Sequence, residues 1–324
     1  MMSRRDALLA LGGSLVALGA PAARAAERLR VGKAVIEVFG YIPLDVGIKY
    51  GFFAKQGLEI EEINFAGGPK LAQAITAGAV DIGLSSGPAM AYSAKGAPEI
   101  AVATITASPA FMGLNVGQAS SARSIDDLKG KRIGVASAGS LTDWLVAELN
   151  RAKGWSDDRD RAVSVAIGGE PTAEFAALKT GAVDATLGGV ATGYELEEQH
   201  AGRLLGDVSA YVKELELFTT FASNAIVQQN PDAVRRFLTA WYDTVAFMKS
   251  HRAETVAVTS AVIPGYTAAV SARLYDGLVS QFSTTGKFEP AALEKLRASF
   301  VDLKILEPSA DMSKLYTEAF LPKI

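Results

Sequence analysis

The sequence contains no cysteine, and this absence excludes several classes of protein at once. Disulfide frameworks, zinc sites built on thiolates and catalytic thiols all require cysteine, as does the lipid anchor of an exported lipoprotein. We therefore expect no metal site of this kind, no bound cofactor and no thiol chemistry.

Histidine is almost as scarce, with only His200 and His251 in 324 residues. Both lie in charged, hydrophilic stretches, which is typical of exposed surface residues. No recognisable nucleophile motif pairs a histidine with Ser86 or Ser140. The sequence also has no phosphate-binding loop and no dinucleotide fingerprint. It therefore predicts a protein that is not an enzyme.

A strong excess of charge of either sign is also missing. The chain has 32 basic and 35 acidic residues and a net charge of −3, so no basic face for nucleic acid is evident. Its hydrophobic content of 49% can form a large core, and its length is typical of about two domains. We expect a monomer that binds no nucleic acid.

The first 25 residues differ in kind from the rest. Arg4 and Arg5 precede an apolar run from Ala7 to Ala20, and an A-x-A cleavage site ends at Ala25. This pattern is typical of a secretory signal peptide and is too short for a membrane-spanning helix. We predict export to the periplasm with cleavage after Ala25. The two arginines resemble a twin-arginine signal, but Ala7 replaces its usual phenylalanine, so both export routes stay open.

A tetrapeptide, Gly-Ala-Val-Asp, occurs twice, at residues 78–81 and 181–184. In both copies an alanine-rich amphipathic run precedes the glycine and a short apolar run follows the aspartate. A glycine after a helix can adopt the left-handed conformation that ends it, and the apolar run is typical of a buried strand. Two copies about a hundred residues apart indicate two similar lobes. Asp81 and Asp184 would start strands and serve a structural role.

The order of the predicted elements is typical of an α/β protein in which each lobe has a mainly parallel sheet flanked by helices. We assign 26–110 and 220–324 to lobe 1 and 111–219 to lobe 2. Residues 106–116 should form an extended crossover and 218–227 a further strand. The remaining helices, which should pack on lobe 1, are predicted to begin at 230 and to span 253–261, 267–282, 290–302 and 311–320.

Ligands of open parallel sheets bind beyond the carboxyl ends of the strands. Six loops rich in small residues meet this condition, at 39–41, 65–69, 85–87, 137–142, 168–170 and 188–192, and they include Gly68, Gly169 and Gly189. Ordinary turn chemistry explains any one of these loops, whereas six in equivalent places favour a cleft. Tyr41 and Phe111 are candidate stacking surfaces. The loop at 137–142 precedes a helix and is a natural site for an anion.

The chain resembles the periplasmic substrate-binding proteins of ABC importers, in the nitrate/sulfonate/taurine and thiamine-precursor (NMT1/THI5-like, SsuA-like) group. The resemblance rests on residues 47–60, 78–83, 127–135 and 229–234, in the expected order. It implies a type II-like periplasmic-binding-protein fold of two lobes with a two-strand hinge. It also implies that the protein delivers a small-molecule solute to a permease in the inner membrane that works with an ATPase.

Carried over by position, the resemblance implies a ligand-binding cleft lined by Tyr41, Gly67, Ser85, Ser86, Ser137, Gly139, Ser140 and Thr142, with Phe111 and Phe218 near the crossovers.

Lys70 and Glu170 are the charged residues of these loops. We therefore expect a small organic anion, a sulfonate or carboxylate that can be aromatic, rather than nitrate. A thiamine-precursor pyrimidine is the alternative ligand. A ligand-sensing role remains open. The pyrimidine-making enzyme of this fold is disfavoured, because it uses cysteines that this chain lacks.

Overall fold

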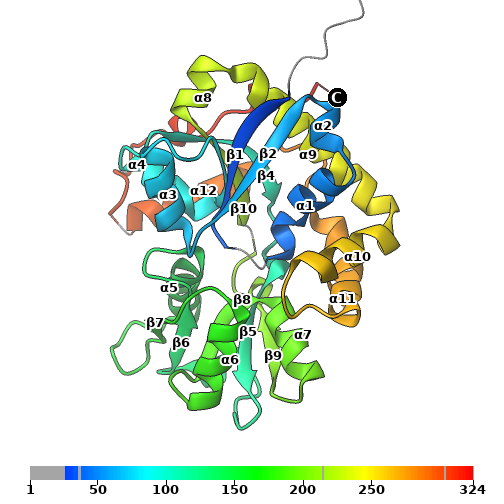
Figure 1. Ribbon diagram of the computed structural model, residues 1–324. Coiled ribbons are helices and arrows are strands. Elements are labelled where there is room, and N and C mark those ends of the chain that lie inside the picture. The colour runs from blue at the N-terminus through cyan, green and yellow to red at the C-terminus, as the bar shows by residue number, and fades with distance from the viewer. Residues whose placement is uncertain (1–25, 36–37, 214, 303, 324) are drawn as a thin grey trace, which may run out of the picture.

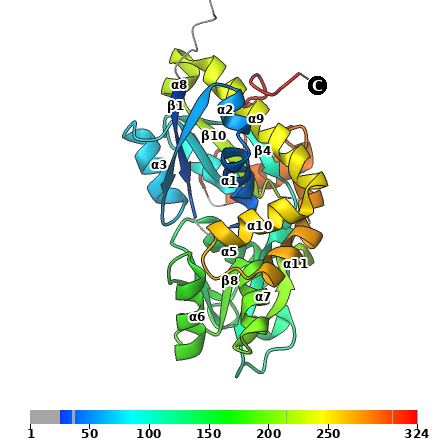
Figure 2. The same cartoon turned by 45° about the vertical axis from the view of Figure 1, so that its right-hand side comes forward.

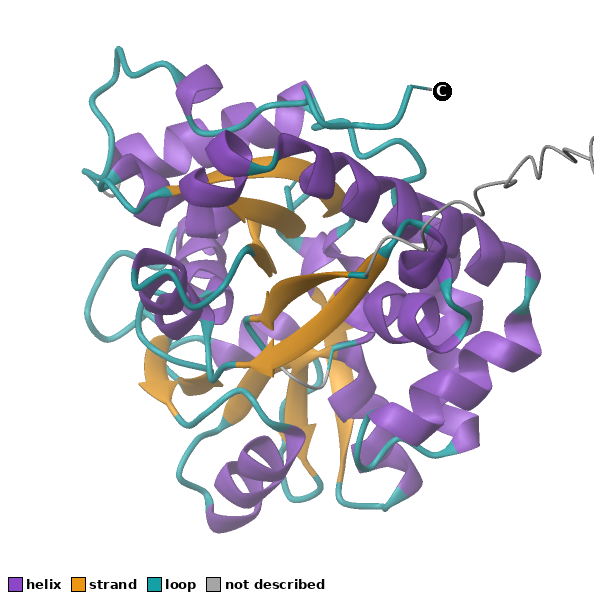
Figure 3. Cartoon of the chain, turned by 45° about the horizontal axis from the view of Figure 1, so that its top comes forward, coloured by secondary structure: helices purple, strands orange, loops and turns teal. Residues whose placement is uncertain are grey.

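The protein folds into two α/β halves, one above the other in Figure 1. The computed structural model describes residues 26–35, 38–213, 215–302 and 304–323. The predicted signal peptide, residues 1–25, lies outside them with its cleavage site. Helices flank each of the two sheets (Figure 3).

The first sheet has the strand order β2-β1-β3-β10-β4. β1 is parallel to both β2 and β3, whereas β10 is antiparallel to both of its neighbours. Four strands therefore share one direction and one strand opposes them. The strands are β1 (Glu27–Lys33), β2 (Leu58–Asn64), β3 (Ile82–Ser86), β4 (Glu99–Thr106) and β10 (Phe218–Ser223).

The second sheet repeats this arrangement with the order β7-β6-β8-β5-β9. β6 is parallel to β7 and β8, and β5 is antiparallel to β8 and β9. In each half the opposed strand, β10 or β5, is the one that the chain enters after crossing from the other half. The strands are β5 (Met112–Gly117), β6 (Arg132–Val135), β7 (Val163–Ala166), β8 (Ala185–Gly189) and β9 (Gly202–Asp207).

The repeated tetrapeptide has the same structure in both halves. Gly78 and Gly181 have φ values of 71° and 70°, and each ends a helix as predicted. Asp81 accepts hydrogen bonds from the backbone and side chain of Arg30. Asp184 does the same with Arg132. Both aspartates thus join neighbouring strands at the ends remote from the predicted cleft.

The helices begin and end close to the predicted positions. Proline lies in the first turn of several of them, where its missing N–H costs nothing. They are α1 (Ile42–Lys49), α2 (Phe52–Lys55), α3 (Gly68–Thr76), α4 (Met90–Ala94), α5 (Leu141–Lys153), α6 (Pro171–Thr180), α7 (Val190–Glu198), α8 (Asn224–Gln229), α9 (Pro231–Ser250), α10 (Arg252–Val262), α11 (Ala268–Leu278) and α12 (Pro290–Asp302).

Three predictions for the elements are wrong in part. Residues 106–116 are not only a crossover, because β5 begins at Met112. The strand predicted to reach residue 227 ends at Ser223, whose hydroxyl caps α8. The helix predicted at 311–320 is reduced to a 3-10 turn, Met312–Lys314. Beyond this turn the chain pairs with β4, where Ala101 donates to Leu315 O and accepts from Thr317 N.

The C-terminal helices do not all pack on the first half. α9 and α10 contact α1, as predicted, but α11 contacts α7 of the second half (Figure 2). On another side, α12 reaches α5, where Ser299 donates a hydrogen bond of 2.9 Å to Glu148. The C-terminal region therefore connects the two halves outside their crossovers.

Candidate functional site

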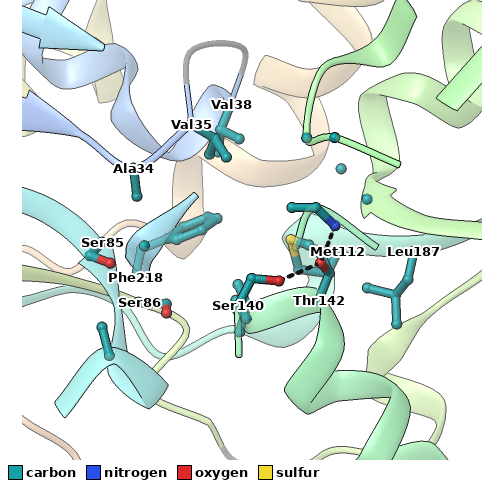
Figure 4. A pocket seen from close by; sticks show the side chains of 18 of the residues that line it. Ala34, Val35, Val38, Ser85, Ser86, Met112, Ser140, Thr142, Leu187 and Phe218 are labelled. Carbon is teal, nitrogen blue, oxygen red and sulfur yellow. Dashed lines mark hydrogen bonds between the residues drawn. The ribbon is translucent and has the colours of Figure 1, made fainter. Parts of the chain in front are cut away.

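A cavity with a volume of about 70 Å³ lies between the two halves, and both contribute to its wall. Its wall is formed where strands end and helices begin, which is the position predicted for the six loops. In Figure 4, Ser85, Ser86 and Phe218 lie on one side and Thr142 and Leu187 on the other. The first half supplies Ala34, Val35, Val38, Tyr41, Gly68, Ser85, Ser86, Ala89, Tyr92 and Phe218. The second half supplies Met112, Gly134, Ala136, Gly139, Ser140, Leu141, Thr142, Gly168, Gly169, Pro171, Glu174, Leu187, Gly188, Gly189 and Thr192.

On the first half, the wall is organised around the end of β3. Tyr41 donates a hydrogen bond of 3.0 Å to the carbonyl oxygen of Ser85, which fixes its ring against the strand. The ring of Phe218 lies 5.2 Å from that of Tyr41, centre to centre. Because Tyr41 is buried, its pKa lies above the ordinary value, and its phenol stays neutral. This wall is apolar apart from the hydroxyl groups of its two serines and two tyrosines.

On the second half, the loop at 137–142 folds over the start of α5. The side chain of Ser140 caps α5 by accepting from Asp143 N, and its Oγ lies 3.0 Å from Thr142 Oγ1. Thr142 Oγ1 accepts from Ala136 N at 2.9 Å, and Asp143 accepts from Gly139 N at 2.8 Å. Ser137 N, Gly139 N and Ser140 N, which the sequence suggested as donors for an anion, are already bonded within the loop or to Asp143.

A hydrogen bond closes the two halves over the cavity. Tyr92 of α4 donates to the carbonyl oxygen of Gly139 at 2.7 Å. Burial, with contributions from the carboxylates of Glu99 and Asp143, raises the pKa of Tyr92 to about 12, so the hydroxyl keeps its proton. The structure thus has the two halves closed against each other.

Gly67 and Ser137 lie at this contact rather than on the cavity wall. Gly67 has a φ of 102°, and a Cβ built on it would lie 2.9 Å from Ser137 Oγ. Both the left-handed backbone and the close approach of the two halves therefore require glycine here. These residues form a further close contact between the two halves.

Glu174 is the one acidic residue of the described cavity wall, and the same wall has no lysine, arginine or histidine. Its side chain is buried. Burial raises the pKa of Glu174 to about 7, although hydrogen bonds from Thr186 and Asn115 oppose this shift. The charged loop residues noted in the sequence, Lys70 and Glu170, do not line the cavity.

Of the other predicted site residues, Phe111 lies outside the cavity and the rest line it. Phe111 lies outside the cavity, packed among Phe39, Phe218 and Phe282, and is 3% exposed. It supports the ring of Phe218 instead of facing a solute. The structure brings the remaining predicted residues together on the cavity wall, namely Tyr41, Gly68, Ser85, Ser86, Gly139, Ser140, Thr142, Gly169, Gly189 and Phe218. That they bind a solute stays a prediction.

Sequence reasoning missed Tyr92, Glu174 and the apolar side chains of Val35, Met112 and Leu187. Glu174 lies one turn into α6 on the face that carries Pro171, so its position in the helix was a usable signal. The sequence pattern around the apolar residues indicated only that they belong to strands or to the core.

Metal and membrane features are absent from the residues that the structure describes. No group of three potential metal-ligating side chains occurs among them. No helix in the same part of the chain is long and apolar enough to span a bilayer.

Comparison with known families agrees with this architecture. The family described as NMT1/THI5 like matches residues 39–255, which is more than half of the chain. The chain belongs to the NMT1/THI5-like family. No curated protein sequence matches it significantly.

Solved structures with the same fold include periplasmic binding proteins. The alkanesulfonate-binding protein SsuA from Xanthomonas axonopodis pv. citri, bound to MOPS, is 20% identical with a TM-score of 0.70, covering 86% of this chain and 94% of its own. SsuA from Escherichia coli, an aliphatic sulphonate-binding protein, is 20% identical with a TM-score of 0.70, covering 90% and 92%. The nitrate-binding protein NrtA from Synechocystis PCC 6803 is 14% identical with a TM-score of 0.71, covering 90% and 86%. The predicted two-lobed periplasmic-binding-protein fold is confirmed.

Proposed function

We propose that this protein is an extracytoplasmic solute-binding protein of an ABC importer and captures a small organic solute between its two halves. The observation that carries the proposal is the cavity, whose wall comes from both halves and which the Tyr92 hydroxyl closes. Closure of two lobes around a ligand is a known mode of binding proteins. The halves would correspond to the predicted lobes, 26–110 with 220–324 and 111–219, except that β10 of the first sheet already begins at Phe218, and a two-strand hinge would join them.

A small organic anion, a sulfonate or carboxylate that can be aromatic, is the first candidate for the solute. Gly68, Ser140, Pro171 and Gly189 all lie on the wall, and each stands at the start of a helix. Helix starts favour negative charge through the helix dipole and through free N–H groups. In α5 the N–H groups of Gly139 and Asp143 are already bonded within the loop, so these two groups add nothing to the dipole. The ring of Phe218 with Met112 and Leu187 would contact an apolar body.

A thiamine-precursor pyrimidine is the second candidate, and one observation favours it. The described wall has no basic side chain to neutralise an anion. A neutral heterocycle needs none, and it would fit between the Phe218 ring and the hydroxyl groups of Ser85, Ser86 and Thr142.

The proposal has no catalytic step. Export would follow cleavage after Ala25, and the closed form would dock on a permease in the inner membrane that works with an ATPase. A sensory role, in which the closed form docks on a receptor, would use the same cavity. Stimulation of the ATPase by the solute-loaded protein distinguishes uptake from sensing.

Thermal unfolding of the mature chain with a panel of sulfonates, aromatic carboxylates, nitrate and pyrimidines tests this function. A solute that binds only the folded state raises the melting temperature with its concentration. The proposal would be wrong if no solute raised it while the protein chemically converted one of them.

A further inference from the structure

Glu174 has its carboxyl group buried at the edge of the solute cavity. It lies in the first turns of α6, lines the cavity and is 4% exposed. Glutamate is rarely buried to this extent unless a partner compensates the lost hydration. What surrounds the carboxyl group therefore decides its role.

Neutral groups of the second sheet hold this carboxyl group. Thr186 Oγ1 of β8 donates to Glu174 Oε2 at 2.7 Å, and the Asn115 side chain of β5 lies close enough to lower the pKa of Glu174. Both partners are fully buried. A Cβ built on Gly188 would lie 2.1 Å from Glu174 Oε1, so only glycine leaves room for the carboxyl group. Gly188 and Glu174 both line the cavity, so the packing against Gly188 holds the carboxyl group at the cavity wall.

No cation compensates Glu174 in the part of the chain that the structure describes, where its neighbours are the neutral Thr186 and Asn115. Glu148, which is buried to a similar extent, differs in this respect. It pairs with Arg151 at 2.8 Å and with Lys295 at 2.9 Å. An uncompensated buried carboxylate destabilises the empty protein, and such groups concentrate at functional sites.

A purely structural role can be distinguished from a binding role by chemistry. If Glu174 only joined α6 to β8 and β5, the neutral amide of glutamine would accept from Thr186 equally well and would cost less to bury. A carboxylate forms a stronger hydrogen bond than an amide oxygen does, because a bond from N–H to a charged acceptor is about twice as strong as a bond to a neutral one. A glutamate is therefore favoured over a glutamine where a strong N–H donor binds it.

We propose that Glu174 is the specificity-determining residue of the cavity, and that the solute carries an N–H donor, on an amine, amidine or amino-substituted heterocycle, which binds this carboxyl group. The inference rests on the proposed solute-binding function and names the class of solute. An anionic group at the other end of the solute is compatible with it, because the helix starts of α3 and α5 lie elsewhere on the wall. The solute would then be zwitterionic or an amino-substituted aromatic compound.

Calorimetric titration of the whole mature protein with matched pairs of probes tests the inference. The pairs are taurine with ethanesulfonate, and aminopyrimidine with pyrimidine, which differ by the amino group. We expect the native protein to bind the amino member of a pair roughly 10- to 100-fold more tightly. Glu174→Gln should abolish this preference, and Glu174→Asp, which withdraws the carboxyl group, should reduce it.

Glu99→Gln is the matched control. Glu99 is also a buried glutamate whose pKa is raised to about 7 by burial, but it lies on β4 and does not itself line the cavity. This variant should keep the full preference for the amino member. Melting temperatures of all three variants establish that each is folded.

Two outcomes would contradict the inference alone, and a third would contradict the proposed function as well. Equal binding of both members of each pair, or a preference that survives Glu174→Gln, would leave a solute-binding protein in which Glu174 is only structural. Binding of none of these probes, nor of any solute of the wider panel, would contradict the proposed function and the inference with it.

Discussion

The hydroxyl of Tyr92 donates to the carbonyl oxygen of Gly139 at 2.7 Å, joining α4 of the first half to the loop before α5 of the second. Tyr92→Phe removes this bond and keeps the ring. Because the bond forms only when the halves are closed, we expect solute affinity to fall roughly 3- to 10-fold, mainly through faster release. Stopped-flow binding measures this change. A variant that releases solute at the native rate would show that this bond does not hold the closed state.

Gly189 offers a way to block the cavity without disturbing the fold. Its φ of −67° suits any residue, and a Cβ built on it meets only Ala191 N, at 3.9 Å. Gly189→Val should therefore fill the open space and abolish binding while leaving the melting temperature nearly unchanged. Gly139 is a poorer choice, because its φ of 73° would strain any side chain. Native affinity in Gly189→Val would remove this part of the wall from the binding site.

Lys295 of α12 pairs with the buried Glu148 of α5 at 2.9 Å. The segment that leads into α12 is anchored to the first sheet, since Thr104 N donates to Gly286 O at 2.9 Å. Lys295→Met keeps the aliphatic chain and removes the charge, which should destabilise the closed form by roughly 1 kcal/mol. We expect weaker solute binding and a wider distribution of inter-lobe distances in spin-label measurements. Lys314→Met, in the C-terminal 3-10 turn, is the control, and equal effects of both variants would contradict a specific role of Lys295.

Three buried glutamates predict how stability depends on pH. Burial is the main cause that raises the pKa values of Glu99, Glu174 and Glu216 to about 7, from an ordinary 4.5. Between these values the folded protein keeps protons that the unfolded chain has lost, so the free energy of unfolding falls as the pH rises from about 4.5 through 7. At roughly 1.4 kcal/mol per pKa unit, each group contributes at most about 3 kcal/mol to this fall.

Urea unfolding at pH 5 and at pH 7.5 measures this effect. Glu99→Gln should reduce the difference between the two free energies of unfolding, because its amide does not titrate. An unchanged difference would mean that Glu99 carries its charge at pH 5 in the folded protein. Asp184 is not expected to contribute in this range. Burial alone would raise its pKa, but hydrogen bonds from Arg132 lower it below the ordinary value.

Local patterns predicted most of the elements because their causes are local. Gly78 and Gly181 end helices through a backbone conformation that depends on the residue itself, and proline marks the first turn of α3 and α6. The prediction failed at residues 311–320, where a helical apolar pattern competes with pairing to β4. The partner strand lies far away in the sequence, so no local pattern contains it.

The candidate site was predictable as far as topology determines it. The carboxyl ends of the parallel strands in one sheet lie at the same edge, so Ser140, Gly169 and Gly189 were expected near one another. That Ser85 of the other sheet faces them was expected from the equivalent position of its loop. Phe111 was placed wrongly in the cavity, because an aromatic residue beside a crossover can face a solute or pack in the core. Neighbours from other elements, Phe39 and Phe282, decide this in favour of the core.

The sequence by itself determined the two similar halves, the order of their strands and helices, and the small residues at the strand ends, because each follows from backbone preferences and hydrophobic periodicity. Only the tertiary structure decided which groups face the solute cavity and with what charge. In the sequence, Glu174 is a charged residue in the first turn of α6 that could have faced solvent, and it is the contact with Thr186 and Gly188 that buries its carboxyl group beside the cavity. A carboxyl group's hydration, and hence its pKa and its partners, depends on what packs around it in space.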